Sequence, residues 1–118
     1  MTFTQIEALV KDLPRVERST SFGAPALKVD GKMFACTPTH KSADPNSLAV
    51  RLDFPDRDAM IEDDPEVFYI REHYVDYACV LVRLDRIHKD ALRDLLRAGY
   101  TYMAAQKPRV QRTRRKIR

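Results

Sequence analysis

The chain has 118 residues, enough for one domain with its own core, and its hydrophobic fraction of 44% is ordinary for a globular protein. Its apolar runs are short and interrupted by charge, which excludes a membrane-spanning helix. The N-terminal stretch MTFTQIEALVKDLP lacks the apolar core of a secretion signal, so we expect a cytoplasmic protein.

The net charge of +4 is distributed unevenly along the chain. The C-terminal stretch KPRVQRTRRKIR has no acidic residue and seven basic ones, which are Lys107, Arg109, Arg112, Arg114, Arg115, Lys116 and Arg118. Without these seven, 14 basic and 17 acidic residues remain, a net charge of −3 for residues 1–106. We therefore predict one domain over residues 1–106 and a basic tail over residues 107–118.

The first elements in chain order are a helix and a hairpin. Thr4 and Glu7 have the spacing of a capping box, and Pro14 ends the apolar periodicity, which predicts a helix over residues 4–12. Asp30-Gly31 between two apolar runs predicts a two-residue hairpin turn. Its register would place Leu27, Val29, Phe34 and Cys36 in the core, and Lys28, Met33, Ala35 and Thr37 on the opposite face.

The second half of the chain predicts three more strands and two helices. The strands cover residues 47–53, 67–72 and 78–84, with Val80, Val82 and Leu84 pointing inward. The helices cover residues 55–63, starting at Pro55, and 87–105, where apolar residues recur at steps of three and four.

These elements predict an α+β fold with the order α-β-β-β-α-β-β-α. Short turns between strands indicate an antiparallel sheet of about five strands with helices packed on one face. The other face would be open, and Lys28, Arg51 and Arg83 are expected to project from it.

Few residues point to catalysis. Three glycines cannot form a phosphate-binding loop, and neither the histidines His40, His73 and His88 nor the cysteines Cys36 and Cys79 have metal-ligand spacing. The cysteines fit buried apolar strands, and the acidic stretch of residues 62–66 fits a solvated turn. We therefore predict no catalytic residue, cofactor or metal site.

One internal pair is a candidate for a site. His73 and Tyr74 lie in REHYVDY, a stretch that mixes charged and aromatic groups. The tyrosines could stack on nucleic-acid bases, but a strand–turn–strand segment with half-buried tyrosines explains the same pattern.

The sequence also resembles the MmcQ/YjbR family of small bacterial proteins. The resemblance spans residues 3–105 and rests on LPRVERSTSFGAPALKVDGKMFA, on DPEVFYIREHYVDY, and on VLVRL followed by ALRDLL. It implies a CyaY-like α+β fold and the family's description as DNA-binding, and it brings no catalytic residue set.

The sequence leaves two main classes of function open, and a third class is less favoured. The first is a non-enzymatic DNA-binding protein whose tail contacts phosphates without sequence preference, extended by Lys28, Arg51 and Arg83 on the open face. The alternative is a small protein- or ligand-interaction domain with an incidental basic tail. The third is an enzyme whose site, around His73 and Tyr74, forms only in three dimensions.

Overall fold

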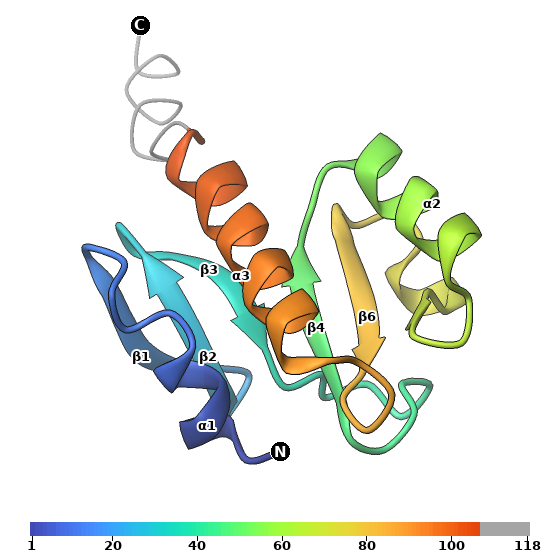
Figure 1. Cartoon of the computed structure of the whole chain (residues 1–118), viewed down its shortest axis with the longest axis horizontal. Helices are drawn as coiled ribbons and strands as arrows, with labels where there is room; N and C mark the ends of the chain where they lie inside the picture. Colours follow the sequence, from blue (N-terminus) through green and yellow to red (C-terminus); the bar gives the residue numbers. More distant parts are fainter. Residues whose placement is uncertain (107–118) are drawn as a thin grey trace, which may run out of the picture.

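A computed structural model describes residues 1–106 of the chain. The predicted tail of residues 107–118, with its seven candidate phosphate-binding cations, lies outside the described residues. The described part is an α+β fold in which one antiparallel sheet carries helices on one face (Figure 1), as the sequence predicts.

The sheet has six strands in the order β1-β2-β3-β4-β6-β5, one more than expected. The strands are β1 (Val16–Ser21), β2 (Ala24–Val29), β3 (Lys32–Cys36), β4 (Ser47–Arg51), β5 (Phe68–Tyr69) and β6 (Cys79–Arg83). The helices are α1 (Phe3–Ala8), α2 (Phe54–Asp63), α3 (Lys89–Ala104) and a single 3₁₀ turn, η1 (Glu72–Tyr74).

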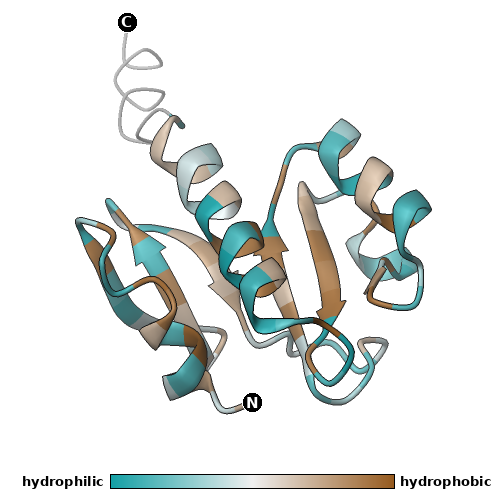
Figure 2. Cartoon of the chain, viewed as in Figure 1, coloured by the Kyte–Doolittle hydropathy of each residue, from teal (hydrophilic) through white to brown (hydrophobic). Residues whose placement is uncertain are grey.

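The additional strand is β1, an edge strand with a polar sequence. Its residues, VERSTS, are mostly hydrophilic (Figure 2), and none of them is buried. A two-residue turn, Phe22-Gly23, joins β1 to β2, with φ of 52° and 81°. A bulky residue rarely adopts positive φ, so the sequence gives little sign of this turn.

The first helix begins one residue earlier and ends four residues earlier than predicted. Thr2, not Thr4, is the N-cap: the Gln5 amide donates to the Thr2 hydroxyl at 3.2 Å and the Thr2 amide donates to Gln5 Oε1 at 2.8 Å. With Thr2 as the N-cap, Phe3 lies within the helix on the same face as Ile6, and both side chains pack against the core.

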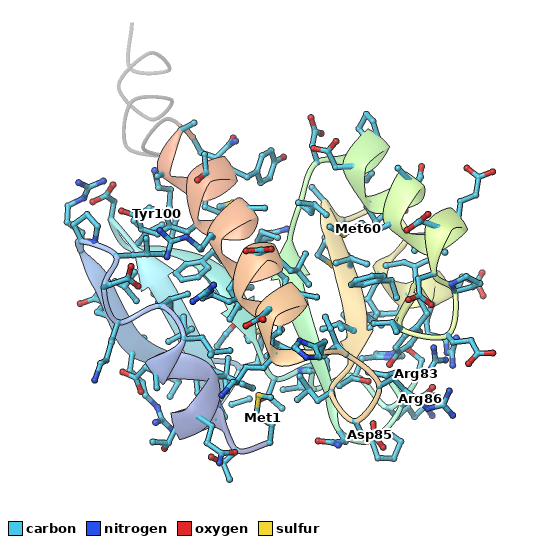
Figure 3. The ribbon with its side chains drawn as sticks, in the orientation of Figure 1. Met1, Met60, Arg83, Asp85, Arg86 and Tyr100 are labelled. Atoms are coloured by element: carbon cyan, nitrogen blue, oxygen red, sulfur yellow. The ribbon has the colours of Figure 1, made fainter. Side chains whose placement is uncertain are left out.

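All three α-helices pack against one face of the sheet. The core between them contains Leu48, Val50, Val80 and Val82 from the central strands, and Leu92, Leu95 and Leu96 from α3. Tyr100 of α3 (Figure 3) packs edge-on against Phe34, with ring centroids 5.8 Å apart, and its hydroxyl donates to the Pro14 carbonyl at 2.8 Å. The opposite face of the sheet has a smaller apolar cluster and no α-helix over it in residues 1–106.

A β-bulge corrects the predicted pairing of β2 with β3. Val29 pairs with Lys32 and Lys28 with Met33, as expected, but Leu27 pairs with Ala35 because Phe34 is an extra residue in β3. Phe34 and Ala35 therefore both face the helices, and Cys36 turns to the open face beside Ala26 and Ala49. The prediction that Cys36 belongs to the main core and Ala35 to the other face was wrong.

Within residues 1–106, no helix is both long and apolar enough to cross a membrane.

Candidate functional site

The open face of the sheet carries a cavity of about 600 Å³. Its floor comes from the three central strands: Cys36 ends β3, Ala49 and Arg51 alternate on β4, and Cys79 begins β6. The register places Cys36 opposite Ala49, and Arg51 opposite Cys79. The β-bulge in β3 thus contributes directly to the floor, because it brings the Cys36 thiol to this side.

Aromatic side chains form much of the wall. Five rings come from three separate segments, namely Phe22 of the β1–β2 turn, His40 of the β3–β4 loop, and His73, Tyr74 and Tyr77 around η1. The imidazoles of His40 and His73 stack, with centroids 3.7 Å apart and planes 10° apart. Phe22 and Tyr77 are 94% and 52% exposed, so the rim presents ring surface to solvent.

His40 is held as a neutral imidazole. Its Nδ1 accepts a hydrogen bond from the Ser42 amide at 3.1 Å and lies 2.8 Å from the Ser42 hydroxyl, so the ring proton sits on Nε2. Partial burial lowers the pKa of His40 from its ordinary value of 6.5, and the neighbouring His73 and Lys41 add to this effect. The Tyr74 hydroxyl fixes the same loop by accepting from the His40 amide at 3.3 Å.

Arg51 places a positive charge on the floor. Its Nε is fully shielded from solvent and has no hydrogen-bond partner within residues 1–106. The thiols beside it do not balance this charge, because burial raises the pKa of Cys36 to about 11 and also raises the pKa of Cys79. Both thiols therefore stay protonated at neutral pH.

Arg57 of α2 supports the aromatic wall from behind. Its guanidinium is buried and donates from one Nη1 to the carbonyls of Val75 at 2.9 Å and Tyr77 at 3.1 Å. The Asp58 carboxylate accepts a hydrogen bond from the Arg57 Nε at 2.9 Å. The guanidinium carbon of Arg57 lies 4.8 Å from the centroid of the Phe54 ring. One side chain thus fixes the loop that carries Tyr77 and follows Tyr74.

The YjbR family model matches residues 11–102, most of the chain. The chain belongs to the YjbR family. Every residue that lines the cavity falls inside the matched region, so the cavity is part of this YjbR domain. The prediction of family membership is confirmed.

One solved structure supports the fold. The crystal structure of the Deinococcus radiodurans protein DR2400, which has a DUF419 domain, matches with a TM-score of 0.73 at 21% sequence identity. The match covers 96% of this chain and 86% of that one. At this identity the likeness supports the fold alone. Comparison with curated proteins gives no match.

The predicted site residues of the YjbR domain separate into three places. His73, Tyr74 and Arg51 come together at the cavity. Lys28 projects from the same face on β2 but does not line the cavity. Arg83 lies at the other end of the β4–β6 ladder from Arg51, near Arg86 (Figure 3).

Arg83 is engaged in a cluster around Asp44. Arg71 and Arg83 both donate to the Asp44 carboxylate, at 3.0 and 3.1 Å, and Arg83 also donates to the carbonyls of Pro65 and Glu66. Both guanidinium carbons lie over the Tyr69 ring, at 4.5 and 4.2 Å from its centroid. A phosphate contact from Arg83 would therefore compete with several internal bonds.

The cluster predicts a loss of stability in acid. Hydrogen bonds from Arg71 and then Arg83 hold the pKa of Asp44 below its ordinary value of 3.8. Asp44 therefore binds a proton less readily in the folded state than in the unfolded state. Its contribution to the free energy of unfolding is complete above pH 3.8 and is lost as the pH falls through the pKa of the folded state. Urea unfolding between pH 7 and pH 2.5 should show a shallower acid loss in Asp44→Asn than in wild type. An unchanged pH profile would contradict the assignment.

Proposed function

We propose that this YjbR domain is a binding module for a small planar ligand and that the open-face cavity is its site. The observation that supports this most strongly is the convergence of five aromatic rings, from residues 22, 40, 73, 74 and 77, on one cavity of about 600 Å³. Ligand sites are concave, mostly apolar and about 300–1,000 Å³, with a few placed polar groups. The cavity has this size and this composition.

The proposed role is binding rather than catalysis. A nucleophilic cysteine requires a lowered thiol pKa, whereas the pKa values of Cys36 and Cys79 are both raised by burial. The Nδ1 of His40 is occupied by hydrogen bonding to Ser42. These features favour a site that holds a ligand without reacting with it.

The test uses 2-naphthamide, a flat neutral probe, and two alanine variants. Ala49→Leu adds three carbons to the cavity floor, and Ala98→Leu makes the same change on the exposed side of α3, across the sheet. Saturation-transfer NMR should detect binding to wild type and Ala98→Leu and a strong loss in Ala49→Leu. Tyr77→Ala, which removes an exposed rim ring, should weaken binding without a folding defect. Equal signals from all four proteins would contradict the proposal.

A second candidate is nucleic-acid binding, which the charge distribution favours. Seven cations and no acidic residue occupy positions 107–118, whereas residues 1–106 have a net charge of −3. We propose that any such binding is electrostatic, non-specific and carried mainly by the tail, with Lys28, Arg51 and Arg83 as the candidate extension. The Asp44 cluster makes Arg83 the weakest member of that extension.

Salt dependence separates the two candidates. Duplex DNA is titrated at several salt concentrations against the full chain and against residues 1–106. If the tail contacts five to seven phosphates, the log–log slope of the full chain should be roughly −4 to −6, and truncation should remove binding. Salt-insensitive binding, or none at low salt, would contradict the DNA hypothesis and leave the ligand hypothesis standing.

A further inference from the structure

We propose that the ligand of the open-face cavity carries a single carboxylate, which Arg51 binds, on a flat apolar body that contacts the aromatic wall. This inference rests on the proposed function, since it names the chemical class of the ligand for that same site. It is argued from the hydrogen bonding of Arg51, the charge of the lining and the arrangement of the rings.

Arg51 differs from the other shielded arginines in its hydrogen bonding. Arg57 donates to two carbonyls and the Asp58 carboxylate, and Arg83 donates to two carbonyls and the Asp44 carboxylate. By contrast, the Nε of Arg51 is buried and has no acceptor in the described part of the chain. Buried donors of charged groups nearly always have an acceptor, because a buried donor without a hydrogen bond lowers the stability of the fold. The Nη groups of Arg51 likewise donate no hydrogen bond within residues 1–106, so the guanidinium that lines the cavity is left for an acceptor supplied by a ligand.

The lining leaves the charge of Arg51 uncompensated. Among the described residues that line the cavity there is no aspartate or glutamate. The two flanking thiols remain protonated, and His40 is neutral because its Nδ1 accepts from Ser42. One positive charge in a partly apolar cavity matches one negative charge best, since a dianion would bring an unpaired charge into the site.

A carboxylate also fits the geometry of a guanidinium. The two Nη groups of arginine form a planar fork that binds both oxygens of a carboxylate, and this arrangement does not require the shielded Nε. Arg51 ends β4 at the cavity floor, so a carboxylate bound there would direct the rest of the ligand outward. The stacked imidazoles and the exposed Phe22 and Tyr77 offer ring surface along that path.

The test compares 2-naphthoate with 2-naphthamide, which have the same shape but differ in charge. Isothermal titration of the full chain at neutral pH should show naphthoate binding at least about tenfold more tightly than naphthamide. Arg51→Met should reduce naphthoate affinity about tenfold or more and change naphthamide affinity less than about twofold. Lys28→Met makes the same charge change on the same sheet face outside the cavity, so it should leave both affinities unchanged.

The outcomes distinguish this inference from the proposed function. Equal affinity of wild type for the two probes, or equal losses in Arg51→Met and Lys28→Met, would overturn the carboxylate inference but leave the cavity as a ligand site. Failure of both probes to bind wild type would overturn both. Should Arg51→Met fold poorly, the ratio of the two affinities in wild type decides by itself.

Discussion

Replacing Arg57 with alanine is expected to lower the free energy of unfolding by about 2–4 kcal/mol and to abolish ligand binding at the open-face cavity. Two charge-assisted hydrogen bonds, to the carbonyls of Val75 and Tyr77, would be lost, and a cavity would form beside Phe54. The loop that carries Tyr77 would lose its attachment to α2, so the aromatic wall would no longer be fixed. Chemical denaturation and probe titration measure the two effects.

A matched control is Arg86→Ala. Arg86 makes one ion pair, with Glu66 at 3.2 Å, in which the side chains are 57% and 80% exposed. Such pairs contribute little, so we expect a change of no more than about 0.5 kcal/mol and unaltered probe binding. If Arg57→Ala were as mild as this control, Arg57 would not be the support that its contacts indicate.

The second large effect is expected at Gly99, where α3 approaches β4. A Cβ at this position would lie 2.9 Å from the Arg51 carbonyl oxygen and 2.8 Å from Val50 Cγ1. The carbonyl belongs to the sheet and cannot move without disturbing β4, so Gly99→Ala should cost about 1–3 kcal/mol in overpacking. Alanine's better helix propensity offsets about 1 kcal/mol. A net destabilisation of up to about 2 kcal/mol should appear in thermal or urea unfolding.

The neighbouring position calibrates the propensity effect. Ala98 is exposed on the same helix, so Ala98→Gly measures the propensity difference without a packing change and should cost about 1 kcal/mol. Stabilisation of the protein by Gly99→Ala would show that α3 does not lie this close to the sheet. Gly99 packs against the backbone carbonyl of Arg51, and the Arg51 side chain forms part of the cavity floor. The position of α3 therefore also affects the position of the floor.

The parts of the fold that the sequence predicts correctly are mainly those in which apolar residues recur with the period of a strand or a helix. The inward orientation of Val80, Val82 and Leu84 and the apolar face of α3 are both as predicted. The Asp30-Gly31 turn also has the positive φ values, 53° and 77°, that its residues favour. Local chemistry determines each of these features.

The wrong predictions concern features that leave no periodic pattern of apolar residues in the sequence. The bulge at Phe34 adds one residue to β3, which reverses the faces of Ala35 and Cys36, and nothing in the local sequence requires it. The edge strand β1 buries too little apolar surface to produce an alternating pattern. Its turn also uses Phe22 where glycine or asparagine is usual.

The site was only partly predictable for a similar reason. His73 and Tyr74 were predicted as a candidate pair because their segment mixes aromatic and charged residues, but His40, which stacks on His73, lies in a loop far away in sequence. Arg57 lies in a strongly polar helix and resembles a surface residue until its contacts with Val75 and Tyr77 are known. The pairing of Arg83 with Asp44 likewise depends on tertiary structure.

The most direct test of the central claim is an amide chemical-shift map of the full chain during titration with 2-naphthoate. If the open-face cavity is the ligand site, the largest shifts should cluster at residues 37–40, at Arg51 and at residues 73–79, with smaller effects at Phe22 and Gly23. They should saturate with one common dissociation constant. The absence of shifts, or shifts confined to residues 107–118, would contradict the claim.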